Sequence, residues 1–151
     1  MNEWKSVDDL LDFAIQNEEE AAAFYRELAS RAGGSAMKQA FEDYAKEEDG
    51  HKSKLLKLKA SGTLGKAAGT VLDLKVADYL ADVEPTADMD YQQILIIAMQ
   101  SEKAAFRLYS DMAAATTDAG LKELLLLLAQ EEAKHKLRFE IEYDEEILRE
   151  N

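Results

Sequence analysis

The sequence predicts an all-α fold, a bundle of four long helices, and three observations support this prediction. Helix-favouring alanine, leucine, glutamate and lysine dominate the 151 residues, which include one proline and seven glycines. Apolar residues recur at alternating spacings of three and four along four segments, at roughly 7–30, 35–60, 88–114 and 118–147. The last two segments repeat the first two, in register, 84 residues further along the chain.

The boundaries of these segments carry signals for helix ends. The first helix is expected to begin after Ser6, a residue type that caps helix N-termini. A tight break at 31–35 ends it, and we expect Ser35 to cap the second helix. A short loop around 116–118 separates the third helix from the fourth. Because both loops are short, the two helices of each pair are predicted to be antiparallel neighbours.

A longer connection, at roughly 61–87, joins the two halves. We expect it to contain a short amphipathic helix at 73–81 and to end near Pro85. A connection of this length suits a crossover that carries the chain to the far end of the bundle. The predicted fold is therefore a ferritin-like four-helix bundle, a single domain over residues 1–151 with an internal repeat at 7–60 and 88–147.

Charge and composition exclude several classes of function. The formal net charge is −13, so nucleic acid and anionic membrane surfaces are not expected partners. No apolar run approaches the ~20 residues needed to span a bilayer, and the N-terminus has no apolar signal segment. The chain has no cysteine, which rules out disulfides and thiolate metal sites. We expect a cytoplasmic protein.

Four glutamates and two histidines fall at inward-facing positions of the predicted helices. Residues three apart project from the same face of a helix, so Glu48 with His51, and Glu132 with His135, each present two donors together. One further glutamate from the first helix and one from the third lie at similar depth, counted from the loops at ~1.5 Å per residue. The candidate metal ligands are Glu18, Glu48, His51, Glu102, Glu132 and His135.

This set is typical of a carboxylate-bridged two-metal site inside a four-helix bundle. Carboxylate oxygen and imidazole nitrogen suit iron(II), manganese and zinc, and four carboxylates balance two divalent cations. We predict two metal ions, for which iron, manganese and zinc are all suitable. Glu47 and Glu131 are also repeated but lie beside the ligand positions, where they would support a ligand or form a salt bridge.

Two tyrosines are the candidate catalytic residues. Tyr25 and Tyr109 lie seven residues after Glu18 and Glu102, two helical turns along the same face. One interpretation is core packing with a hydrogen-bonded hydroxyl group. The other is donation of a hydrogen bond to a ligand carboxylate. Both interpretations can hold together.

The motifs resemble a known family. Residues 14–25 with 44–51, and their repeats at 98–109 with 128–135, are similar to the rubrerythrin-like branch of the ferritin-like superfamily. The resemblance covers both helix pairs and implies a centre of two iron ions (Fe2+/Fe3+), with manganese or zinc as substitutes, held by the six ligands above. It further implies that this centre reduces hydrogen peroxide or dioxygen in oxidative-stress defence. It also implies a separate electron donor, a rubredoxin-like or flavin protein, because the cysteine-rich rubredoxin domain is missing. We also expect a homodimer.

One further departure from rubrerythrins keeps alternatives open. Rubrerythrins carry an additional glutamate one turn after the ligand of the third helix, and this chain has Ala105 there. The remaining ligand set is closer to that of symmetric ferroxidases. The alternative function is therefore iron binding and oxidation for iron handling or storage, without peroxidase turnover. A third alternative is a structural bundle with a vestigial site.

Overall fold

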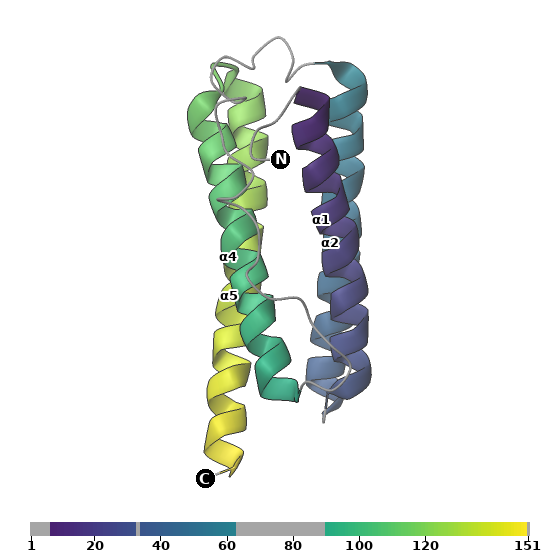
Figure 1. Ribbon diagram of the computed structural model, residues 1–151, viewed down its shortest axis with the longest axis vertical. Helices are drawn as coiled ribbons and strands as arrows, with labels where there is room; N and C mark the ends of the chain where they lie inside the picture. The colour runs from purple at the N-terminus through teal and green to yellow at the C-terminus, as the bar shows by residue number, and fades with distance from the viewer. Residues whose placement is uncertain (1–6, 33, 63–89, 151) are drawn as a thin grey trace.

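The computed structural model describes residues 7–32, 34–62 and 90–150, which form four helices (Figure 1). These are α1 (Val7–Arg31), α2 (Ser35–Ser61), α4 (Tyr91–Ala115) and α5 (Ala119–Glu150). No strand occurs in this part of the chain. The all-α prediction is confirmed, and each predicted helix agrees with the structure to within three residues at its ends. Ser6, the predicted helix at 73–81 and Pro85 lie outside the described residues.

The directions of the four helices are those that a long crossover between α2 and α4 predicts. α1 and α2 are antiparallel neighbours, and so are α4 and α5 (Figure 1). The C-terminal end of α2 and the N-terminal end of α4 lie at opposite ends of the bundle (Figure 1). α2 and α4 therefore run in the same direction, as in a ferritin-like bundle. Among the described residues, no helix combines the length and the hydropathy that a membrane span requires.

The helix ends correct two details of the sequence prediction. Ser35 is not the cap of α2 but its first residue; Gly34 takes the cap position with extended backbone and no side-chain hydrogen bond. α4 begins at residue 91 rather than 88, because Asp90 and Gln93 form a capping box. The Asp90 carboxylate accepts from the Gln93 backbone N–H at 2.8 Å, and the Gln93 side chain accepts from the Asp90 N–H at 2.9 Å.

Two apolar clusters fill the bundle on either side of its middle. The cluster nearer the start of α1 is mainly aliphatic and includes Leu11, Leu55 and Leu125. The cluster nearer the start of α4 is rich in aromatic rings and includes Phe41 and Phe139. Glutamates and histidines occupy the layer between the clusters, so the apolar core encloses a polar layer on both sides.

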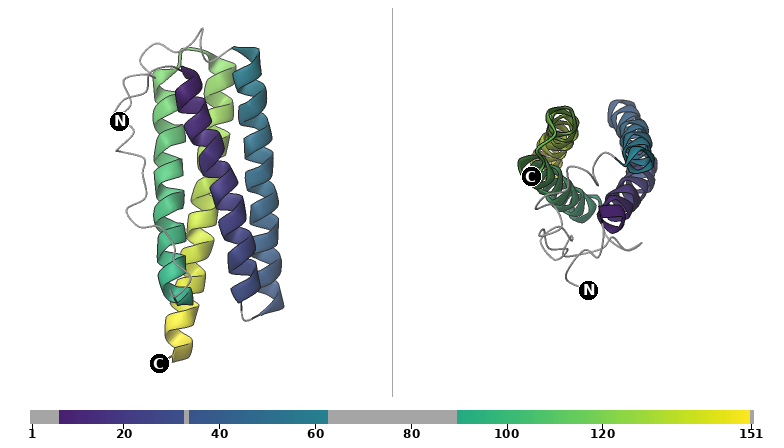
Figure 2. Two further views of the ribbon diagram at one scale, coloured as in Figure 1. Left: turned by 45° about the vertical axis from the view of Figure 1, so that its right-hand side comes forward. Right: turned by 90° about the horizontal axis from the view of Figure 1, so that it is seen from above.

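The two helix pairs approach each other most closely along α1 and α4 (Figure 2). Side chains make the contact between α2 and α5, among them the rings of Tyr44 and His135, whose centroids are 4.3 Å apart. Ion pairs cross the exposed side of the α1–α2 pair, at distances of 2.6–2.7 Å: Arg26–Asp49, Lys52–Glu19 and Lys59–Asp12. Such exposed pairs each contribute little to stability, which marks this side as an ordinary solvated surface.

Candidate metal centre

All six predicted ligands lie in the polar layer at the middle of the bundle. α1 and α4 each supply one glutamate, and α2 and α5 each supply a Glu-x-x-His pair from one face. None of the six is more than 2% exposed. Acidic side chains are almost never buried without a partner, so this concentration of buried carboxylates requires positive charge or protons nearby.

The donor atoms of these residues fall into two overlapping groups. Within each group, one donor atom from every residue lies within 4.8 Å of the others. The groups are Glu18, Glu48, His51 and Glu132, and Glu48, Glu102, Glu132 and His135. Glu48 and Glu132 belong to both groups, so each has the position of a carboxylate shared between two neighbouring ions. Each of the other four predicted ligands belongs to only one group.

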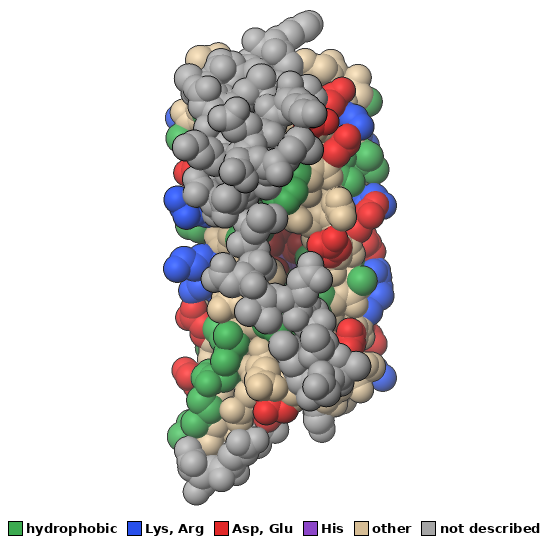
Figure 3. Space-filling model, viewed as in Figure 1, with side chains coloured by type: hydrophobic (Ala, Val, Ile, Leu, Met, Phe, Trp, Pro, Cys, Tyr) green, Lys and Arg blue, Asp and Glu red, His purple; other side chains and the backbone are tan. Residues whose placement is uncertain are grey.

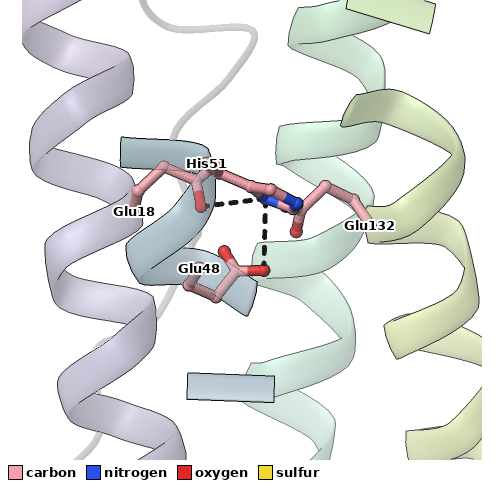
Figure 4. A group of neighbouring side chains, drawn as sticks. All are labelled: Glu18, Glu48, His51 and Glu132. Carbon is pink, nitrogen blue, oxygen red and sulfur yellow. Dashed lines mark hydrogen bonds and ion pairs between the residues drawn. The ribbon is translucent and has the colours of Figure 1, made fainter. Parts of the chain in front are cut away.

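The Nδ1 atoms of both histidines face the inside of the centre. His51 Nδ1 lies 2.9 Å from Glu132 Oε1, 3.4 Å from Glu18 Oε2 and 3.6 Å from Glu48 Oε1 (Figure 4). His135 Nδ1 lies 3.1 Å from Glu48 Oε1 and 3.8 Å from Glu102 Oε2. Each imidazole therefore directs the same nitrogen toward the carboxylates of its group.

The outer nitrogens of the histidines bind carboxylates from the opposite half of the chain. His51 Nε2 in α2 contacts Glu131 in α5, and His135 Nε2 in α5 lies 2.6 Å from Glu47 Oε2 in α2. The side chain of Glu131 is 26% exposed and that of Glu47 is 50% exposed. A proton held on Nε2 by these carboxylates leaves the Nδ1 lone pair for a metal ion.

Removing one of these outer carboxylates is expected to weaken metal binding without removing a ligand. We expect Glu131→Ala to lower the affinity of the centre for iron(II) by about 10–100-fold, because the His51 ring loses the contact that orients it. Anaerobic titration with iron(II) would measure this. Glu123→Ala, on an exposed part of α5, is the matched control and should bind as the unaltered protein does. Equal affinities for all three proteins would contradict an orienting role for Glu131.

Unpaired buried atoms show that the residues fit a metal. Four atoms of the centre are buried and have no hydrogen-bond partner: Glu18 Oε2, Glu48 Oε1, Glu102 Oε2 and His135 Nδ1. Buried polar atoms are normally hydrogen-bonded, so four exceptions in one layer call for an explanation. Two cations held among these oxygens and nitrogens would satisfy all four atoms and balance the charge of four carboxylates.

The ionisation of the metal-free centre shows how crowded its charges are. Burial raises the pKa of Glu48, and the neighbouring carboxyl groups of Glu18 and Glu132 raise it further. Burial also raises the pKa of Glu102 well above its usual range, with Glu132 adding to the effect. Burial alone would lower the pKa of His51, but the neighbouring carboxylates of Glu132 and Glu18 outweigh it and raise the pKa to about 11. Without metal, protons therefore provide part of the neutralisation that cations would supply.

The two candidate catalytic tyrosines differ in their contacts, although their positions are equivalent in the repeat. The Tyr109 hydroxyl donates a hydrogen bond to Glu18 Oε1. The Tyr25 ring instead packs edge-on against the His135 ring, with centroids 5.8 Å apart, and at a tilt against the Phe139 ring, with centroids 5.3 Å apart. Both tyrosines are 1% exposed. Donation to a ligand carboxylate is therefore seen for Tyr109, and core packing for Tyr25.

This difference predicts unequal effects of removing the two hydroxyl groups. Tyr109→Phe should weaken binding of one of the two ions, because Glu18 loses a charge-assisted hydrogen bond worth about 1.5–3 kcal/mol. Tyr25→Phe should leave both affinities close to those of the unaltered protein. Iron(II) titration of the two variants side by side would measure the difference. Equal losses would show that the two tyrosines play the same part.

The sequence did not single out Tyr44 as a site residue. Its ring packs against the ligand His135, with the two ring centroids 4.3 Å apart. Burial raises its pKa. The sequence feature that could have identified Tyr44 is its position one helical turn before Glu48 on the inward face of α2.

Comparison with known proteins identifies the family and the fold of this chain. The family model for rubrerythrin matches residues 9–143. A Thermotoga maritima structure described as a ferritin-like diiron-carboxylate protein is similar with a TM-score of 0.76 and 23% identity, over 97% of this chain and 99% of that one. A hypothetical protein from Pyrococcus furiosus is similar with a TM-score of 0.74 and 25% identity, over 93% of this chain and 89% of that one.

The comparison with curated proteins gave no match. The family match covers most of the chain and includes all six candidate ligands. The Thermotoga structure supports the ferritin-like fold independently of the sequence match. This chain is a member of the rubrerythrin family, and its fold is a ferritin-like four-helix bundle.

Proposed function

We propose that this protein is a di-iron carboxylate oxidoreductase that reduces hydrogen peroxide or dioxygen in oxidative-stress defence. The observation that carries the proposal is the pair of overlapping donor groups in which Glu48 and Glu132 are shared. Glu18 and His51 would hold one ion, and Glu102 and His135 would hold the other. The two shared glutamates would contribute to the binding of both ions. The chemistry that a bound pair of iron(II) ions would supply is two electrons, one from each ion, which together with two protons from solvent reduce one hydrogen peroxide molecule to two water molecules.

The residues around the ligands would give this chemistry a fixed and dry setting. The Tyr109 hydroxyl holds one oxygen of Glu18 and leaves the other, Oε2, directed at the donor group. Glu131 and Glu47 hold the two imidazole rings from outside. The apolar clusters on either side exclude water from the layer, so charges within it interact strongly. Electrons for a further turnover would come from a separate donor protein, rubredoxin-like or flavin-containing.

The alternative is iron binding and oxidation for iron handling, without peroxidase turnover. The observation that favours it is the near symmetry of the centre, in which each donor group has one unshared glutamate and one histidine. Ala105 occupies the position one turn after Glu102, where rubrerythrins carry their additional glutamate. Without that carboxylate, the two ion positions have equivalent ligand sets.

The relative rates with two oxidants separate these functions. Protein loaded anaerobically with two iron(II) ions per chain should be oxidised faster by hydrogen peroxide than by dioxygen when mixed at equal oxidant concentrations. Stopped-flow absorbance would record both reactions. Faster oxidation by dioxygen would overturn the peroxidase proposal and favour iron handling. Glu48→Ala protein treated in the same way is the control for iron bound elsewhere.

A further inference from the structure

Tyrosine rings pack against only one of the two histidines of the centre. The Tyr44 ring is tilted by 34° against the His135 ring, with centroids 4.3 Å apart. The Tyr25 ring meets His135 edge-on at 5.8 Å and lies 6.0 Å from Tyr44, again between centroids. The repeat counterpart of Tyr44 is Leu128, a member of the aliphatic cluster. The place beside His51 that corresponds to Tyr44 therefore holds no oxidisable ring, and the two ion positions differ in their surroundings although their ligands match.

A small oxidant can approach the centre from the side away from Tyr44. Figure 3 shows a hollow near the middle of the face that α1 and α4 form, with acidic side chains at its bottom. α2 and α5 form the opposite side of the bundle (Figure 2). Tyr44 is in α2, and its ring contacts that of His135 in α5. An oxidant that enters through the hollow would therefore reach the metal ions before it reached Tyr44.

The proposed reduction of peroxide needs two electrons at once. When a single iron(II) ion is bound, only one electron is available, and hydrogen peroxide is reduced to hydroxide and a hydroxyl radical. A second electron delivered at the same moment would complete the reduction to water. A phenol side chain can supply it, because its ring delocalises the unpaired electron that remains. A tyrosine in contact with a ligand of the ion is therefore suited to protect a half-filled centre.

We infer that Tyr44 supplies this second electron when only the ion position at His135 is filled, so that no hydroxyl radical is released. The inference rests on the proposed function. The electron leaves the Tyr44 ring through the His135 ring, and the hydroxyl proton passes to solvent. One iron(II) ion, one tyrosine, one hydrogen peroxide molecule and one proton thus give iron(III), a tyrosyl radical and two water molecules. An electron from the separate donor protein and a proton from solvent restore the tyrosine.

The surroundings of the Tyr44 hydroxyl suit the loss of its proton. Burial raises its pKa, and the charges of Arg138, Glu47 and Asp43 also act on it. The hydroxyl is therefore protonated at neutral pH, and its oxidation must release the proton. Tyr44 is half-buried, whereas Asp43 and Glu47 are exposed. The hydroxyl thus lies toward the edge of the bundle, where water can accept the proton.

The other two tyrosines near the centre lack such an outlet. Tyr25 and Tyr109 are both 1% exposed. The Tyr109 hydroxyl donates its hydrogen bond to Glu18, so a proton released from it would pass to a metal ligand. Protonating that ligand would weaken its hold on the ion. Tyr44 therefore combines the shortest ring contact with His135 among these tyrosines and a route for its proton.

Electron paramagnetic resonance of protein that holds one iron(II) ion per chain tests the inference. Mixed anaerobically with hydrogen peroxide and frozen, the unaltered protein should show a tyrosyl radical. Tyr44→Phe should lose this signal and release hydroxyl radical to a spin trap, because the new ring keeps the packing but has no hydroxyl group. Tyr25→Phe is the matched control and should keep the signal, as should Tyr109→Phe. Circular dichroism and iron content establish that each variant is folded and loaded.

Two ligand variants test which ion position is involved. His51→Ala keeps Glu102 and His135 for one ion, whereas His135→Ala keeps Glu18 and His51 for the other. With one iron(II) ion per chain, His51→Ala should give the tyrosyl signal and His135→Ala should lose it. Equal signals from the two variants would overturn the role of the His135 position. Zinc-loaded protein should give no signal, and a signal there would show that iron is not the cause.

The remaining outcomes separate this inference from the proposed function. Absence of a tyrosyl signal from the unaltered protein would overturn the inference, as would a signal that survives in Tyr44→Phe and disappears in Tyr25→Phe or Tyr109→Phe. Protein with two iron(II) ions per chain should consume one peroxide molecule for every two ions and give no radical. Should this fully loaded protein be oxidised faster by dioxygen, the peroxidase proposal fails, while the signal from protein with one ion still decides the role of Tyr44.

Discussion

Replacing Glu48 by alanine is expected to abolish the binding of two iron ions while leaving the helical fold intact. Glu48 belongs to both donor groups, and its Oε1 lies 3.6 Å from His51 Nδ1 and 3.1 Å from His135 Nδ1. One substitution therefore removes a ligand from both ion positions. We expect iron stoichiometry to fall from two ions per chain to at most one, with an affinity loss of at least about a hundredfold.

The metal-free variant should fold at least as well as the unaltered chain. Burial and neighbouring carboxylates raise the pKa of Glu48, so its charged form is unfavourable in the folded protein. Removing one of four crowded carboxyl groups relieves that cost, which offsets the small cavity left behind. Elemental analysis after anaerobic iron(II) loading measures the stoichiometry, and circular dichroism measures the helical content.

The matched control for this prediction is Glu19→Ala. Glu19 directly follows the ligand Glu18 in the sequence, but its side chain points about 100° away around the axis of α1. This half-exposed side chain pairs with Lys52 at 2.7 Å. This variant should retain two iron ions per chain, since an exposed ion pair has no part in the centre. Equal loss of iron from Glu19→Ala and Glu48→Ala would show that the helical register is wrong.

Metal binding is expected to raise the melting temperature substantially. The folded centre gathers four carboxylates that the unfolded chain keeps apart, so cations bind the folded state selectively. An ion present at a thousand times its dissociation constant stabilises the fold by about 4 kcal/mol. For a chain of 151 residues, this corresponds to a rise on the order of 10 °C per ion. Thermal unfolding with zinc or anaerobic iron(II), compared with chelator, measures the difference.

The Glu48→Ala variant again provides the control. Its melting temperature should change little between metal and chelator, because the shared ligand is missing from both donor groups. An unaltered chain whose melting curve is indifferent to metal would contradict a functional centre. It would favour the alternative of a structural bundle with a vestigial site.

The sequence by itself determined the helix pairs and the six residues of the polar layer. A helix repeats every 3.6 residues, so positions three and four apart must share a face, and Glu48 with His51 could be assigned to the interior without a structure. The repeat 84 residues later placed Glu132 with His135 in the same register. The spacing of residues within each helix was sufficient to assign its inward-facing residues, because each helix is long and regular.

Only the tertiary structure decided how the halves meet. His51 pairs with Glu131 and His135 with Glu47, because side chains of α2 and α5 reach across the bundle between the helix pairs. The distance and angle between two helices are not encoded in the spacing of residues within either one. The sequence could therefore place Glu47 and Glu131 beside the ligands but could not assign their partners.

The two tyrosines also show that contacts between helices cannot be predicted from the spacing of residues within one helix. Tyr25 and Tyr109 are equivalent in the repeat, yet Tyr109 bonds to Glu18 while Tyr25 packs against Tyr44 and Phe139. The counterparts of those two aromatic residues in the other half are Leu128 and Leu55. An aromatic cluster thus forms at one end of the bundle and an aliphatic one at the other. Equivalent positions acquire different contacts because packing depends on neighbours that folding alone brings together.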